Sequence, residues 1–184
     1  MQRLLVMTVL GPDRPGLVRS LADLVAEHGG NWLESRMSRL GGQFAGILRV
    51  EVPGEMESRL VAALHALSSQ GLAIVVHPDQ PKTVAQPTPA SQLEIMGQDR
   101  PGIVRQISQA LANHGINVEE LHTGCISAAM SGQTLFKASA RLSIPSSCDT
   151  TQLRRELEEI AADLIVEISL AELPLKERIA GAAL

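Results

Sequence analysis

The chain has 184 residues, of which 45% are hydrophobic and 20% charged, with 16 basic and 20 acidic side chains and a net charge of −4. This composition excludes a disordered chain, and no apolar run reaches the ~20 residues of a membrane span. The two cysteines, Cys125 and Cys148, show no CxxC spacing and the N-terminus has no signal-peptide pattern, so we expect a cytoplasmic protein without a disulfide framework.

The first half of the chain predicts the order β-α-β-β-α-β. Strands follow from short apolar runs, and helices follow from apolar residues at helical spacing. Asp13 is a typical N-cap residue and Pro15 suits the first turn of the helix that follows. Gly41-Gly42 predicts a hairpin turn. The predicted elements are strand 4–10, a helix that follows the Asp13 cap and has its apolar stripe at 17–25, strands 32–39 and 43–52, a helix with its apolar stripe at 56–67, and strand 72–76.

The second half repeats the first with an offset of 86. Residues 11–34 and 97–120 are identical at 12 of 24 positions. The second copy is six residues longer between its asparagine and its phenylalanine, and Phe44 corresponds to Phe136. Its predicted elements are strand 92–96, helix 103–111, strands 117–128 and 133–144, a helix around 153–160 and strand 164–170.

Two helices and four strands per copy favour an α+β, ferredoxin-like βαββαβ domain. We therefore expect a first domain at 1–77, a proline-rich linker at 78–90, a second domain at 91–171 and a C-terminal tail at 172–184 with helix-forming character. Helices cover only one face of such a sheet, so we expect the two domains to pack as a pseudo-dimer. Open strand edges also make a homodimer plausible.

The repeated segment Gly-x-Asp-Arg-Pro-Gly-[Leu/Ile]-Val, followed by Gly-x-Asn, resembles the ACT domain, and the resemblance covers both halves. Two such domains without an added catalytic module resemble the glycine cleavage system transcriptional repressor family. That resemblance implies a regulatory protein that binds a small amino acid, glycine in particular, and that acts on transcription through a partner regulatory protein. It also implies that the protein does not read DNA directly.

The two repeated loops are the candidate ligand sites. Each precedes a helix N-terminus, where free backbone N–H groups and the helix dipole favour a carboxylate. The glycines allow close approach, and the arginines can add a charge-assisted hydrogen bond. The same residues also suit a plain turn in which the aspartate caps the helix. The loop residues are Asp13, Arg14, Gly16 and Leu17, and Asp99, Arg100, Gly102 and Ile103.

Asn31 and Asn117 open the following strand and are expected beside the loops, where their amides could bind an amino-acid head group. They could equally satisfy their own backbone in a turn. His28 and His114 precede helix-ending glycines, where contact with the last helical carbonyls is the expected role. Cys148 lies in a loop before a helix, where its thiolate could be somewhat stabilised, although an inert loop cysteine is the favoured interpretation.

Other chemistry is poorly supported. The sequence shows no catalytic constellation, no metal-ligand spacing and no cofactor motif, and leucine or isoleucine replaces the lysine of a nucleotide-binding P-loop. The basic stripe that DNA binding needs is missing. Two alternatives to an amino-acid sensor stay open: an interaction module that needs no ligand, and a regulatory subunit of a metabolic enzyme.

Overall fold

A computed structural model describes residues 1–79, 90–127 and 133–173. The chain divides into two compact units, one holding the first four strands and the other the last four. The predicted tail helix and most of the predicted linker lie outside the described residues. The domain boundaries stay predictions, although the fourth strand ends at Pro78 and the fifth begins at Ala90.

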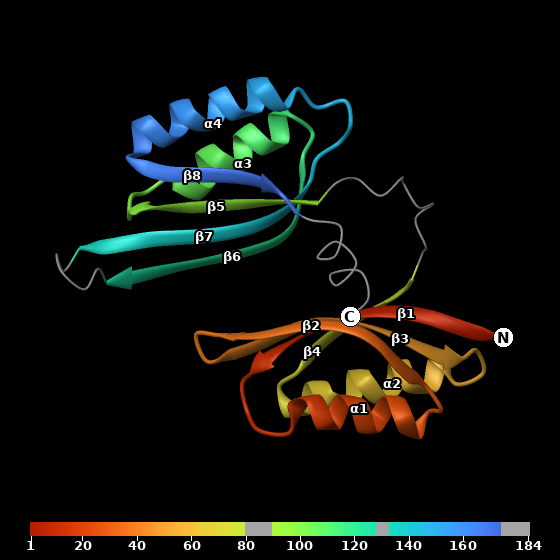
Figure 1. Cartoon of the computed structure of the whole chain (residues 1–184). Coiled ribbons are helices and arrows are strands. Elements are labelled where there is room, and N and C mark those ends of the chain that lie inside the picture. Colours follow the sequence, from red (N-terminus) through yellow and green to blue (C-terminus); the bar gives the residue numbers. More distant parts are fainter. Residues whose placement is uncertain (80–89, 128–132, 174–184) are drawn as a thin grey trace. The chain divides into compact units, whose positions relative to one another are not determined.

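The first unit has the predicted β-α-β-β-α-β order (Figure 1). Its strands form one antiparallel sheet in the order β2-β3-β1-β4. Gly41 and Gly42 both have positive φ, as the predicted two-residue hairpin between β2 and β3 requires. The elements are β1 (Gln2–Pro12), α1 (Leu17–Glu27), β2 (Asn31–Leu40), β3 (Gln43–Pro53), α2 (Glu57–Ala66), the short 3-10 helix η1 (Leu67–Gln70) and β4 (Ala73–Pro78).

The second unit repeats this architecture with the sheet order β6-β7-β5-β8. Leu164, predicted to begin the last strand, is instead the final residue of its helix, and Ile165 ends that helix in the left-handed conformation before the strand starts. The elements are β5 (Ala90–Gln98), α3 (Ile103–Asn113), β6 (Asn117–Ser127), β7 (Thr134–Ser143), α4 (Thr150–Leu164) and β8 (Val166–Glu172).

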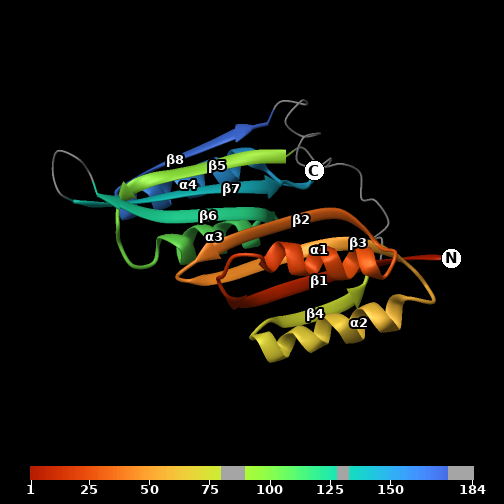
Figure 2. The same cartoon turned by 90° about the horizontal axis from the view of Figure 1, so that it is seen from below.

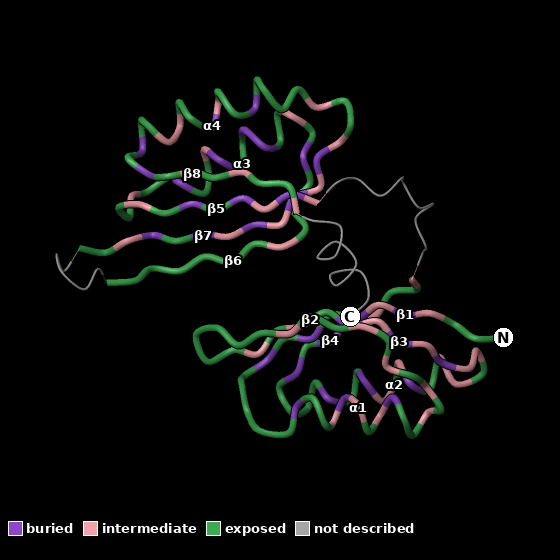
Figure 3. The backbone as a smooth tube through the Cα atoms, viewed as in Figure 1, coloured by how far each residue is buried: buried purple, intermediate pink, exposed green. Residues whose placement is uncertain are grey.

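Each sheet is covered by its two helices on one face, as Figures 1 and 2 show. Buried residues alternate along the strands and line the helix-covered face of each sheet (Figure 3). The predicted apolar stripes supply the helical half of each core: Leu17, Leu21 and Val25 on α1, and Ile103, Ile107 and Leu111 on α3. The other face of each sheet, here called the open face, carries no helix of the residues that the structure describes.

Trp32 near the start of β2 packs half-buried against the core of the first domain. Its partner on β3 is Val50, and the corresponding pair in the second domain is Val118 and Leu142. The two copies therefore differ in the size of the side chain at this edge of the core.

Candidate functional site

The repeated loops end at glycines that begin the helices. Gly16 and Gly102 occupy the N-cap positions of α1 and α3 with φ of 90° and 101°, and no side chain caps either helix. The prediction that Asp13 caps its helix and that Pro15 lies in the first turn is wrong. The left-handed glycine delays the helix to the next residue, which leaves its first N–H groups without a side-chain acceptor.

The loop aspartates fasten the loops to the neighbouring hairpins instead. The N–H of Asp13 donates to the Gly42 carbonyl at 2.9 Å, and its carboxylate lies 3.7 Å from Nε of Arg39. The N–H of Asp99 donates to the Thr134 carbonyl at 3.1 Å. Both aspartates thus fix where the loop lies, while the helix ends stay uncapped.

The loop arginines lie on the surface. Arg14 donates from Nη2 to Oε1 of Gln70 at 2.8 Å, and Arg100 donates to Oε1 of Gln98 at 3.3 Å. Both contacts are solvent-exposed, so they compete weakly with another acceptor. A carboxylate held at the helix end could replace these glutamine contacts by an ion pair with the arginine.

The two glycines of each loop have different roles. A Cβ on Gly16 or Gly102 would meet no atom within 4 Å, so the space beside each helix end is open to a ligand. A Cβ on Gly11 or Gly97 would lie 2.6 Å from backbone atoms of the segment that leads into β4 or β8. The first glycine of the motif is therefore needed for packing, a role that the sequence pattern did not reveal.

Leu17 and Ile103 are buried in the two cores, with 3% and 2% of their surface exposed. Their side chains point away from any ligand beside the loop. Leu17 and Ile103 can therefore contribute to binding through their backbone N–H groups and not through their side chains.

The prediction that Asn31 and Asn117 lie beside the loops is wrong. The loops leave the ends of β1 and β5, and the intervening 11-residue helix, about 16 Å long, carries the chain back along the sheet before β2 or β6 begins. Asn31 pairs with Glu51, at the opposite end of β3 from Gln43, which pairs with Pro12. The asparagines and the loops therefore occupy opposite ends of each domain.

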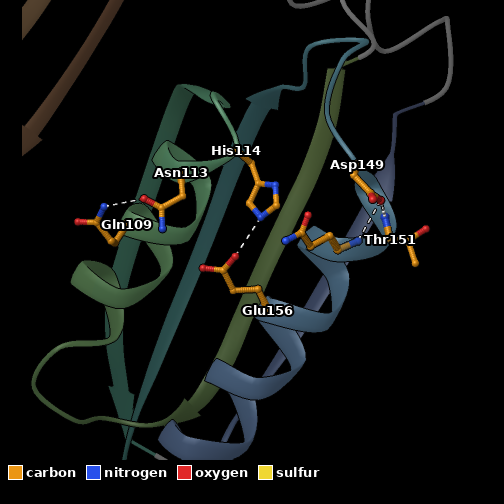
Figure 4. Close-up of polar contacts among 7 residues, drawn as sticks. Gln109, Asn113, His114, Asp149, Thr151 and Glu156 are labelled. Atoms are coloured by element: carbon orange, nitrogen blue, oxygen red, sulfur yellow. Dashed lines mark hydrogen bonds and ion pairs between the residues drawn. The ribbon is translucent and has the colours of Figure 1, made fainter.

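The two histidines that end the first helices differ. His28 contacts the Leu24 carbonyl through Nδ1 at 2.8 Å, which confirms the expected role at a helix end. His114 instead places Nε2 2.9 Å from Oε2 of Glu156 on α4, with 11% of its side chain exposed (Figure 4). This contact joins α3 to α4.

The carboxylate of Asp149 caps α4 by accepting from the N–H groups of Thr151 and Gln152.

Neither thiol is activated. Partial desolvation, followed by the nearby Asp99 carboxylate, raises the pKa of Cys125, and desolvation with Asp149 raises the pKa of Cys148. The raised pKa agrees with the favoured interpretation of Cys148 as an inert loop cysteine and opposes a stabilised thiolate, because Asp149, the cap of α4, places a negative charge near the thiol.

We expect both thiols to react more slowly with iodoacetamide at pH 7 than free cysteine does, because the raised pKa keeps them protonated. Their rates should rise through a higher pH range than that of free cysteine. Mass spectrometry of Cys125→Ser and Cys148→Ser, each retaining one thiol, measures the two rates separately. A rate at pH 7 above that of free cysteine would contradict the expectation.

In the parts of the chain that the structure describes, no three His, Cys, Asp or Glu side chains come together as a metal site. Within the same residues no helix combines the length and apolar character needed to span a membrane.

Comparison with known proteins relates both halves to one family. The ACT domain model matches residues 3–77, and a second ACT domain model matches residues 91–136. The glycine cleavage system transcriptional repressors of Escherichia coli K12 and Shigella flexneri are each 23% identical over 177 residues, covering 92% of this chain and 90% of their own length.

Solved structures show the same fold. A crystal structure of an unknown protein from Galdieria sulphuraria is 29% identical and has a TM-score of 0.82, covering 95% of this chain and 100% of its own. A crystal structure of a candidate glycine cleavage system transcriptional repressor, at 22% identity, has a TM-score of 0.66 and covers 94% of this chain and 98% of its own.

Proposed function

The chain belongs to the ACT-domain family, and from that premise we propose that it is a non-catalytic cytoplasmic regulator that senses a small amino acid. The ligand carboxylate would bind at the N-terminus of α1 or α3. Binding would order the surface around the loop and shift the affinity for a partner protein, a coupling between two sites.

The observation that carries the proposal is the pair of uncapped helix N-termini. Both helices begin at a left-handed glycine with open space beside it, and neither has a capping side chain or an acidic residue in its first turn. In the described chain α4 shows the contrast, because Asp149 already supplies the negative charge there. A bound carboxylate would complete α1 and α3 as Asp149 completes α4.

Glycine is the favoured ligand because of the relatives. The glycine cleavage system transcriptional repressors align with nearly the whole chain and act, by their names, on transcription of a glycine-degrading system. We therefore propose that this chain modulates transcription of genes for amino-acid metabolism through a partner regulator.

Calorimetric titration of the full chain with glycine, alanine, serine and other common amino acids tests the sensor function. We expect saturable binding of at least one of them. Val18 and Val104 are exposed residues in the first helical turns, at 47% and 45% exposure. Val18→Glu and Val104→Glu each place a competing carboxylate beside the free N–H groups, and we expect the variant at the occupied loop to bind at least about tenfold more weakly.

The matched controls Val18→Gln and Val104→Gln have nearly the same shape without the charge. Binding should survive in them. If no amino acid binds the folded protein, or if glutamate and glutamine variants bind equally well, the helix ends do not hold the ligand.

A further inference from the structure

Each sheet has one arginine at the same position on its open face. Arg49 on β3 pairs with Val6 of β1 and with Glu34 of β2. Arg141 on β7 pairs with Gln92 of β5 and with Glu120 of β6. The two arginines are equivalent positions of the duplicated domain, each with a glutamate opposite it on the edge strand.

In the first domain the chain itself supplies a carboxylate to this arginine. Nε of Arg49 donates to Oδ2 of Asp79 at 2.6 Å, and only 15% of the Asp79 side chain is exposed. Asp79 is held in place just beyond β4, where its N–H donates to the Leu4 carbonyl at 2.8 Å.

In the second domain that carboxylate is missing. Leu173 takes the place of Asp79 just beyond β8, and its N–H donates to the Ala90 carbonyl at 2.9 Å in the same way. Nε of Arg141 is buried and has no hydrogen-bond partner among the described residues. The carboxylate of Glu120 comes only to 3.8 Å, beyond hydrogen-bonding distance. Buried charged donors are normally satisfied, so this atom calls for an acceptor.

The side chains next to the two arginines also differ, being apolar beside Arg49 and polar beside Arg141. Val6 and Ile47 lie beside Arg49 on the open face, whereas Gln92 and Ser139 take those positions beside Arg141. The Gln92 amide donates to Oγ of Ser139 at 2.5 Å, so these polar groups form a small network next to the arginine. In the second domain a long ion pair with Glu120 stands in place of the short Arg49–Asp79 pair, and polar neighbours replace the apolar ones.

We propose that Arg141 binds the carboxylate of a small molecule, in the position that Asp79 occupies in the first domain. One quarter of the Arg141 side chain is exposed although its Nε is buried, so a ligand would have to approach Nε from the exposed part of the side chain. In the first domain a hollow of about 150 Å³ lies beside Arg49 on the open face. A small carboxylate suits the site better than a protein surface does, because its polar and charged lining lacks the apolar centre of a stable protein interface.

This site is distinct from the helix N-termini of the proposed function. It lies on the open sheet face and uses an arginine side chain, whereas the loops offer backbone N–H groups of α1 and α3. Variants at Arg141 and Leu173 therefore test it without touching the loops, and either hypothesis can fail alone.

The test is a titration of the 15N-labelled full chain with sodium acetate, followed through the Nε–Hε signal of Arg141 at constant ionic strength in chloride. We expect a saturable shift in the wild type. Leu173→Asp should supply the acceptor from within, as in the first domain, and weaken acetate binding at least tenfold. Leu173→Asn is the matched control without the charge and should still bind acetate. If Leu173→Asp does not fold, Arg141→Gln is tested in its place. Because this variant lacks the Arg141 Nε–Hε signal, binding is followed through the backbone amides of β5 and β8. The same tenfold loss of acetate binding is expected.

Three results would each overturn the proposal. The first is the lack of a saturable shift in the wild type, and the second is an equal shift with chloride alone. The third is acetate binding of undiminished strength in Leu173→Asp or Arg141→Gln. Asp79→Leu offers a reciprocal check, because it frees Arg49 and should add a second, weaker acetate site in the first domain.

Discussion

Gly97→Ala is expected to lower the free energy of unfolding of the second domain by about 3 kcal/mol, near the upper end of typical overpacking costs. The added Cβ would lie 2.6 Å from Cα of Val166 and 2.7 Å from the carbonyl oxygen of Ile165. Both are backbone atoms at the start of β8, so a side-chain rotation cannot relieve the overlap. The domain would have to separate β5 from β8. Urea unfolding followed by far-ultraviolet circular dichroism measures the loss.

Gly124→Ala in the same domain is the matched control. A Cβ at this exposed position of β6 meets nothing within 4 Å, and Gly124 is not among the glycines with positive φ. Alanine there should be neutral or stabilising by about 0.5 kcal/mol, because it loses less backbone entropy on folding. Equal destabilisation by the two alanines would show that close packing is not the reason for glycine at position 97.

The second large effect is expected for Leu142→Ala, which should cost about 2–5 kcal/mol. Leu142 is fully buried on the helix-covered face of β7, within the core cluster of the second domain. Truncation removes buried methyl groups and leaves a cavity that the surrounding side chains of α3 and α4 fill only in part. Thermal and urea unfolding should both show the loss.

Leu121→Ala provides the comparison on the neighbouring strand. Half of the Leu121 surface is exposed, so its truncation should cost clearly less than that of Leu142, on the order of 1 kcal/mol. A comparable cost for both substitutions would contradict the assignment of Leu142, and not Leu121, to the core.

The architecture was largely predictable from the sequence, because each element follows from a local pattern. Alternation of apolar residues predicted the strands, the spacing of Leu17, Leu21 and Val25 predicted α1, and the repeat with an offset of 86 predicted the second domain. Helix starts were harder to predict. Asp13 has the side chain of a typical cap, but the N-cap position belongs to the left-handed Gly16, three residues later.

The sites were less predictable because they depend on direction and distance. Asn31 follows the loop by only about 15 residues, yet the helix between them carries it to the other end of the sheet. The difference between Arg49 and Arg141 depends on Asp79 and Leu173, which lie beyond the last strand of each copy. In the first half that partner is 30 residues away along the chain, so no motif connects the two.

Trp32 gives the first domain an optical signal of its own. It is the single tryptophan of the chain, there is no tyrosine, and its indole is half-buried against the core of the first domain. Intrinsic fluorescence therefore follows the first domain, while far-ultraviolet circular dichroism follows both. Recording the two signals through one urea titration separates the stabilities of the duplicated halves in an unlabelled protein. Trp32 also lies at the opposite end of its sheet from the proposed ligand loop.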